Sequence, residues 1–177
     1  EKIELTPGGP RFSKLIQGYW RMGEWARSPQ EHLAFLEQHI DLGISTVDHA
    51  NIYGQPACET LFGQALKLAP ALREKIEIVT KCGIELGDDR GRVAHYRSDR
   101  RYITDTLELS LTRLGVENVD VLLLHRPDLL MNVDDVVGAA FMPTDGQANP
   151  SDITLSLAKG ARMAGATLLE DTKVLSV

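Results

Sequence analysis

The stretch LGISTVDHANIYG, residues 42–54, combines an apolar run with a carboxylate and a phenol. The run ISTV has the β-branched composition of a strand, and it ends at Asp48. Tyr53 follows in a turn that Gly54 closes. We therefore expect a strand at residues 44–48 that delivers Asp48 and Tyr53 to one end of a sheet.

Two later apolar segments end in the same way. Residues 75–82 carry Lys81 near their end, and residues 119–125, VDVLLLH, end at His125. A nearly continuous apolar segment such as VDVLLLH is typical of a strand that is covered on both faces. A further strand is expected earlier in the chain, at residues 15–20.

The segments between these strands have the spacing of amphipathic helices, with recognisable start and stop signals. Ser28 can cap the first helix, because Glu31 completes a capping box and Pro29 suits the first helical position. The expected helices run from Ser28 to Gly43, over residues 58–69, and from a cap at Ser98 or Asp99 to Gly115. Strands that alternate with helices predict a parallel α/β sheet with right-handed crossovers.

Two segments differ from this pattern. Residues 1–14 contain Pro and Gly between short apolar pieces, which predicts a β-hairpin. Residues 83–97 are charged and are expected to form a solvated loop.

Composition limits the kind of protein. The 177 residues suffice for one ordinary domain with a core. A net charge of -6 argues against a nucleic-acid partner, and no apolar run approaches the roughly 20 residues of a membrane helix. Cys58 and Cys82 lack the spacing of a metal site, so we expect no metal, two reduced core cysteines and a cytoplasmic protein.

The polar residues at the strand ends form a candidate active site. In parallel α/β folds, chemistry collects at the carboxyl ends of the strands. Asp48, Lys81 and His125 all fall at such ends, and Tyr53 lies just beyond one of them. Any one of them alone could be structural, but their joint placement favours a site.

Four motifs around these residues resemble those of the aldo-keto reductases, which are (β/α)8 barrels that reduce carbonyls with NADPH. The motifs are GYWRMG (residues 18–23), TVDHANIYG (46–54), VTKCG (79–83) and LLLHRPD (122–128). The resemblance covers residues 1–137 and implies a TIM-barrel type half-barrel that holds the family's catalytic tetrad. That tetrad falls on Asp48, Tyr53, Lys81 and His125.

The resemblance implies a role for each member of the tetrad. Tyr53 would donate a proton to the carbonyl oxygen, although a tyrosine is a reluctant acid near neutral pH. Lys81 would stabilise the phenolate, and Asp48 would keep Lys81 charged and oriented. His125 would position the carbonyl oxygen.

Three residues of the first motif and its loop complete the candidate site. Trp20 and Trp25 could form the walls of the substrate pocket together with His125, although ordinary core packing explains both tryptophans equally well. Arg21 could approach the cofactor, which would also contact Asp48.

The resemblance ends near residue 137. The chain supplies four of the family's strands, and the motifs that grip the adenosine phosphate are not found. The segment PTDGQANPSDITLSLAKGARMAGA, within residues 138–177, resembles an internal part of FAD-dependent dimethylglycine and sarcosine dehydrogenase-like oxidases. It lacks a GxGxxG loop, so we expect no FAD site.

The tail, residues 138–177, is expected to fold as a helix and strands. Asn149 or Ser151 can cap a helix that ends at Gly165, and two short strands would follow. The simplest explanation of this organisation is a chimera of two oxidoreductases.

Three functions remain open from the sequence. The first is an NADPH-dependent reductase of a small aldehyde or ketone. The second is an inert chimeric or truncated fold without a cofactor site. The third is a subunit that self-association completes, because the open edges of a half-barrel favour a homo-oligomer.

Overall fold

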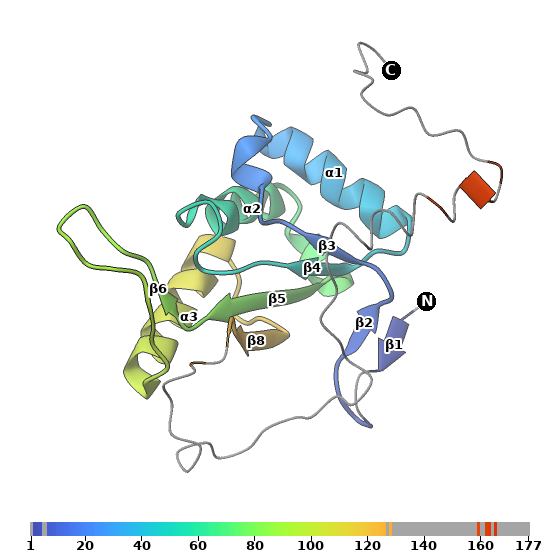
Figure 1. Ribbon diagram of the computed structural model, residues 1–177. Coiled ribbons are helices and arrows are strands. Elements are labelled where there is room, and N and C mark those ends of the chain that lie inside the picture. The colour runs from blue at the N-terminus through green and yellow to red at the C-terminus, as the bar shows by residue number, and fades with distance from the viewer. Residues whose placement is uncertain are drawn as a thin grey trace. The chain divides into compact units, whose positions relative to one another are not determined.

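The computed structural model describes residues 2–4, 7–126, 128, 159, 162–163 and 165 (Figure 1). It divides into two compact units, Glu1–Met131 and Asn132–Val177. The labelled helices and strands given below all belong to the first unit. In the part of the chain that is described, no helix is long and apolar enough to cross a membrane.

A four-stranded parallel sheet forms the centre of the first unit. Its strands lie in the order β3 (Ile16–Gly18), β4 (Thr46–Asp48), β5 (Glu77–Cys82) and β8 (Val121–Leu124) (Figure 1). All neighbouring pairs run parallel. The sheet therefore confirms the predicted α/β half-barrel, although each strand is shorter than its apolar segment.

Three helices connect the strands. They are α1 (Pro29–Asp41), α2 (Ala57–Leu68) and α3 (Arg100–Leu114). The capping box of α1 is formed, because the main-chain N–H of Ser28 donates to Glu31 Oε2 at 2.7 Å and the Ser28 hydroxyl accepts from the N–H of Glu31. Of the two candidate caps of α3, Asp99 is the one that accepts a hydrogen bond, from the N–H of Tyr102.

Two short 3-10 helices lie in the loops. They are η1 (Met22–Glu24), after β3, and η2 (Pro70–Lys75), after α2. The second helix takes up Lys75, which the sequence had assigned to a strand. Pro70 explains this difference, because it ends α2 and starts a new turn.

The hydrophobic core lies between the sheet and the helices. Val47 and Ile78, which are partners in the register of β4 and β5, pack against Phe62 of α2 and Leu114 of α3. Tyr19, just after β3, is buried in the same cluster. The helices thus cover one face of the sheet. The strand residues next to Val47 and Ile78 in sequence point to the other face, because side-chain direction alternates along a strand.

An N-terminal hairpin forms, as predicted, and it is attached to the amino end of the sheet. It pairs β1 (Lys2–Glu4) with β2 (Arg11–Ser13) in antiparallel fashion. The Ser13 hydroxyl accepts from the main-chain N–H groups of Ser45 and Thr46, at 3.1 and 2.9 Å. These bonds fix the hairpin to the start of β4.

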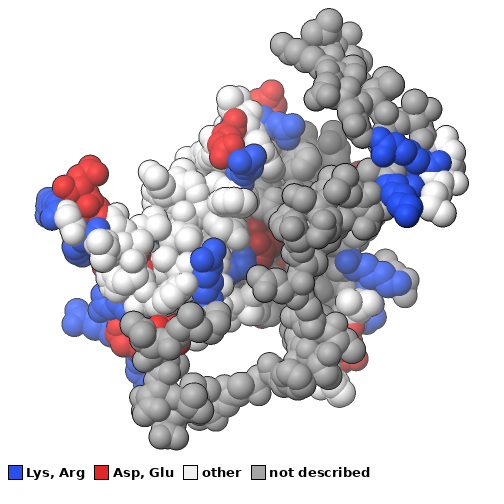
Figure 2. Space-filling view, in the orientation of Figure 1, with Lys and Arg blue, Asp and Glu red and all other residues white. Residues whose placement is uncertain are grey.

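The prediction of a plain loop at residues 83–97 was wrong. The segment contains an antiparallel ribbon of β6 (Ile84–Glu85) and β7 (His95–Tyr96). Glu85 accepts from Arg97 at 2.9 Å and lies 3.4 Å from Arg92, so paired charges stabilise this ribbon. On the face in Figure 2, acidic and basic side chains lie interspersed in the same way.

In the second unit, Lys159, Arg162 and Met163 are helical and Gly165 has a φ of 87°. This agrees with the predicted helix end at Gly165. The remaining predictions for the tail lie outside the described residues.

Gly63 allows α2 and α3 to approach closely. A Cβ atom at this position would lie 2.1 Å from the main-chain oxygen of Arg113 and 2.8 Å from the carbonyl carbon of Leu114. We expect Gly63→Ala to lower the free energy of unfolding by about 3 kcal/mol, because the backbone of α3 must shift. Urea denaturation followed by circular dichroism measures this change. Gly18→Ala is the control, since its added Cβ meets no atom within 4 Å, and an equal loss in both variants would contradict the explanation.

Candidate active site

The carboxyl ends of three strands bring the predicted tetrad together. Asp48 is the last residue of β4, Lys81 lies near the end of β5, and His125 follows β8. The register pairs Asp48 with Val79 and Lys81 with Leu123. Because side chains two residues apart share a face, Asp48, Lys81 and His125 all point to the face opposite the helices.

Lys81 is the centre of the site. Its Nζ donates to Asp48 Oδ2 at 2.7 Å and to Tyr53 Oη at 3.0 Å. A third hydrogen bond, 2.9 Å long, goes to the main-chain oxygen of His49. The side chain of Lys81 is only 13% exposed, so these acceptors replace water around most of the ammonium group.

The three bonds fix the direction of the tyrosine proton. An ammonium group has three N–H donors, and Lys81 directs each of them to an acceptor. Tyr53 Oη therefore accepts from Lys81 and keeps its own proton for another partner. That proton is free to point into the adjoining cavity.

His125 lies against the same tyrosine. The two rings meet edge to face, with their centroids 5.7 Å apart. Burial lowers the pKa of His125, and the positive charges of Lys81 and Arg126 lower it further, against a smaller opposite effect of Asp48. A neutral imidazole is therefore favoured near pH 7. Its Nδ1 is buried and has no hydrogen-bond partner among the described residues.

A cavity of about 280 Å³ opens beside these groups. Its walls combine aromatic and aliphatic side chains with two basic ones. The lining residues are Trp20, Ile52, Tyr53, Ile84, His125 and Arg126. Trp20 lies with its ring centroid 6.4 Å from that of Tyr53, so it borders the cavity as the sequence suggested.

Trp25 and Arg21 lie apart from this cavity. Trp25 packs edge to face against Phe35 at 5.3 Å and lies 5.8 Å from Tyr19, within the aromatic cluster beside α1. Arg21 is exposed, lies over the ring of Trp20 and forms a 3.8 Å ion pair with Glu24. Neither side chain lines the cavity beside Tyr53.

His49 points to the helices, because side-chain direction alternates along a strand and its neighbour Asp48 faces the site. Its ring stacks on Tyr19 at 4.9 Å and meets Phe62 edge to face at 4.5 Å. Its two ring nitrogens are buried without a hydrogen-bond partner among the described residues. Burial, helped by the charge of Lys81, lowers the pKa of His49 to about 3.

Sequence reasoning missed several contributors to the site. The main-chain oxygen of His49 could not be recognised, because a carbonyl leaves no trace in residue type. Ile52, Ile84 and Arg126 line the cavity but were not predicted. Each of them is next in sequence to a residue of a quoted motif: Ile52 to Tyr53, Ile84 to Gly83 and Arg126 to His125. This proximity was the sequence signal that could have identified them.

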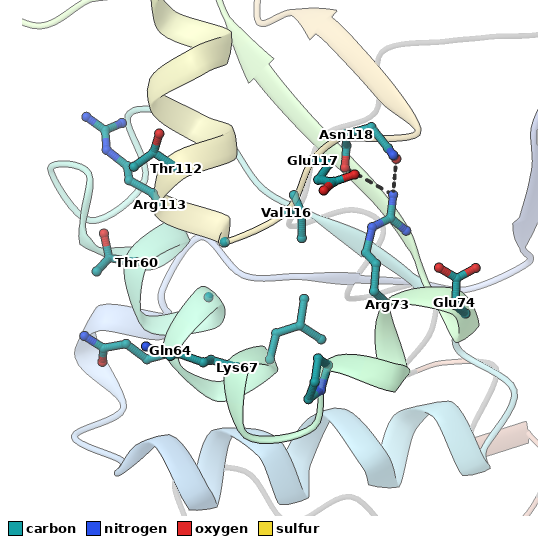
Figure 3. Close-up of a pocket in the computed structure, with 14 residues that line it drawn as sticks. Thr60, Gln64, Lys67, Arg73, Glu74, Thr112, Arg113, Val116, Glu117 and Asn118 are labelled. Atoms are coloured by element: carbon teal, nitrogen blue, oxygen red, sulfur yellow. Dashed lines mark hydrogen bonds between the residues drawn. The ribbon is translucent and has the colours of Figure 1, made fainter.

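A larger cavity, of about 1020 Å³, lies away from the tetrad (Figure 3). It is lined by α2, η2, the end of α3 and residues 115–118. These segments precede β5 and β8, which places the cavity at the amino ends of the strands. Arg73, which borders it, already donates to the side chains of Asn118 and Asp120, at 2.8 and 2.9 Å.

Parallel strands with an Asp, Lys and Tyr cluster at their carboxyl ends define a (β/α)-barrel type of active site. The model of the aldo/keto reductase family matches residues 14–141. The chain belongs to the aldo/keto reductase family.

Known relatives agree with this family. The chain is 48% identical over 140 residues to the oxidoreductase YdhF of Escherichia coli, covering 78% of this chain and 47% of that protein. It is 42% identical over 139 residues to a 6-dehydroglucose reductase of Agrobacterium fabrum, covering 76% and 44%. The glycerol dehydrogenase structure from Gluconobacter oxydans aligns with a TM-score of 0.58 at 28% identity, covering 72% and 39%. The chain thus spans about half the length of these relatives.

The Asp48–Lys81 pair should contribute measurably to stability. We expect Asp48→Asn to lower the free energy of unfolding by about 1–2 kcal/mol, because it leaves a largely buried ammonium without its counter-charge. The value is reduced from that of a fully buried pair, since Asp48 is 28% exposed. The control is Asp105→Asn, which breaks an exposed pair with Arg101 and should leave urea denaturation nearly unchanged. Equal effects of both changes would contradict the burial argument.

The buried His49 should make the fold sensitive to mild acid. Its folded-state pKa lies near 3, below the unfolded value of 6.5, so the unfolded state binds more protons below pH 6.5. Stability due to His49 is therefore complete above that pH and falls by about 2 kcal/mol between pH 6.5 and 5. His32 and His39, whose pKa values burial also lowers, add to the slope. Urea denaturation across this range should give a flatter curve for His49→Phe, and an unchanged slope would refute the assignment.

Proposed function

We propose that the protein reduces an aldehyde or ketone with NADPH as the hydride source. The observation that carries the proposal is the hydrogen bond from Lys81 Nζ to Tyr53 Oη at 3.0 Å, beside His125 and a cavity. Membership of the aldo/keto reductase family supports the same class of reaction. The relatives are about twice as long as the part that this chain matches, so their activity is proposed for this chain and is tested on it directly.

The residues divide the proton chemistry among them. Tyr53 donates its proton to the carbonyl oxygen as negative charge develops there, and Lys81 stabilises the phenolate that remains. Asp48 accepts a hydrogen bond from Lys81 and so holds its Nζ beside the phenol. His125, as a neutral imidazole, donates an N–H to the same carbonyl oxygen and positions it.

NADPH, when bound, supplies a hydride to the carbonyl carbon. The cavity of about 280 Å³ is at the small end of ligand sites, so it suits a reacting carbonyl but not a whole dinucleotide. Asp48 and Arg21 are our candidates for contacts to the cofactor. The buried, unpartnered Nδ1 of His125 is a polar atom that a bound molecule could satisfy.

Substrate and setting are also part of the proposal. A relative's name, 6-dehydroglucose reductase, makes oxidised sugars a useful group to include in an assay panel. We place the protein in the cytoplasm, without nucleic-acid or membrane partners.

We also retain the hypothesis that residues 138–177 derive from a different oxidoreductase. In that case the four residues would keep the arrangement of the family's active site but would not catalyse a reaction. The family match ends at residue 141, close to the point where the sequence resemblance ends.

Tyr53→Phe tests the assignment of the acid. We expect this change to lower carbonyl reduction at least about a thousandfold, because no other group replaces the phenolic proton, while NADPH affinity stays within about threefold. NADPH binding is followed by calorimetry and reduction by loss of nicotinamide absorbance. Tyr96→Phe, on the ribbon strand β7, removes a hydroxyl outside the cavity and should change neither quantity.

Two outcomes would contradict the proposal. Absence of NADPH binding at millimolar concentration would favour an inert fold. Binding with activity that survives in Tyr53→Phe would show that another residue is the acid.

A further inference from the structure

The sheet ends in two open edges. Among the described strands, β3 pairs only with β4, and β8 pairs only with β5. Each edge strand also presents an apolar side chain to water, since Ile16 is 49% exposed and Leu123 is 43% exposed. Unpaired edges with apolar side chains favour association with another strand.

Ile16 and Leu123 lie on the same face of the sheet as the active site. Ile16 precedes Gly18, the partner of Asp48, by two residues, and Leu123 is the partner of Lys81. Residues two apart along a strand share a face. The helices cover the opposite face, so both exposed side chains point to the inner face of the half-barrel.

The register shows which residues would meet if the barrel closed. Ile16 lies opposite Thr46, and Thr46 opposite Glu77. Val79 pairs with Val121, so two residues earlier Glu77 lies opposite Val119. The row of opposed residues across the sheet is therefore Ile16, Thr46, Glu77 and Val119. A (β/α)8 barrel shifts its register by about eight residues in a full circuit, hence by about four over four strands. A second β3 strand placed beside β8 would therefore have its Ile16 opposite Leu123, which lies four residues beyond Val119.

The direction of this shift agrees with the strand positions. In the same rows, β3 spans Ile16–Gly18, whereas β8 spans Val121–Leu124 and so begins two residues beyond Val119. From β3 to β8, each strand is therefore staggered toward the carboxyl ends relative to these rows. A β3 strand of a second copy that continues the same stagger pairs with β8 over the residues that β8 spans.

We propose that two copies of this chain close one barrel, with β8 of each copy paired in parallel with β3 of the other. A two-fold axis along the barrel keeps its strands parallel and pairs both edges of the β3–β4–β5–β8 sheet. The four strands of this sheet that the described residues form are half of the eight in a (β/α)8 barrel, so the described parts of two copies supply the full number. Each interface buries Leu123 of one copy against Ile16 of the other.

The second copy would also contribute to the active site. With Ile16 opposite Leu123, Gly18 of the second copy lies beside His125, two residues further along both strands. Trp20 of the second copy, two residues beyond Gly18, then comes close to His125. The dimer thereby adds an aromatic wall to each cavity, and this inference does not depend on reductase activity.

Disulfide trapping tests this arrangement. Neighbouring strands lie about 4.8 Å apart, which suits a disulfide between opposed residues. The double variant Ile16→Cys/Leu123→Cys should form a covalent dimer on oxidation, and the two single variants should form one only when mixed. The native Cys58 and Cys82 are buried and give little background. Self-linking of Leu123→Cys alone would indicate antiparallel β8 pairing and overturn the closed barrel.

Sedimentation of the full chain provides the second test. We expect twice the mass of the 19.5 kDa chain at micromolar concentration, and a monomer or a larger species would overturn the proposal. Leu123→Asp should weaken the dimer at least about tenfold, because it buries a charge. Leu109→Asp, on the 53% exposed Leu109 of α3, is the matched control and should leave it intact.

A mixing experiment guards against misfolding of the charged variant. Ile16→Lys and Leu123→Asp should each dimerise at least about tenfold more weakly alone than the unchanged chain. Mixed, they should form a dimer, since one interface restores Ile16 with Leu123 and the other pairs lysine with aspartate. Failure to recover a dimer from two folded variants would count against the proposed pairing.

Discussion

The ammonium group of Lys81 determines the arrangement of the site. It requires three acceptors, and the fold provides a carboxylate, a phenol and a main-chain oxygen from three positions in or after β4. Because Lys81 itself belongs to β5, its hydrogen bonds join two strands and the turn between Ala50 and Gly54. The orientation of Tyr53 is a consequence of this demand for acceptors.

The opposite face of β5 is fixed just as firmly. Thr80, the residue before Lys81, donates to the buried Glu59 of α2 at 2.7 Å, and Arg113 of α3 lies 3.5 Å from the same carboxylate. Successive residues of one strand thus anchor it to the helices and build the site. A change in helix packing would move Lys81, since β5 transmits the displacement directly.

The sequence predicted those parts of the molecule that periodicity and strand order encode. The parallel sheet, the hairpin and the capping box at Ser28 followed from local pattern. The assembly of Asp48 with Lys81 followed from their positions at the carboxyl ends of neighbouring parallel strands. The ribbon at residues 83–97 did not, because its strands are only two residues long and its ion pairs, Glu85 with Arg92 and Arg97, follow no helix or strand period. Arg126 was missed for a related reason: the direction of a side chain beyond a strand end depends on tertiary contacts.

The four residues of the tetrad differ in how far the described residues satisfy their hydrogen bonds. Asp48, Tyr53 and Lys81 satisfy one another within consecutive segments, so half a barrel is enough to hold them. His125 follows the edge strand β8, where its main-chain N–H donates to the oxygen of Cys82 at 2.8 Å but its buried Nδ1 has no partner among the described residues. Proton donation is therefore prepared by local structure, whereas orientation of the carbonyl depends on what lies beyond β8. Closing that edge would affect His125 first, and it would leave the three hydrogen bonds of Lys81 as they are.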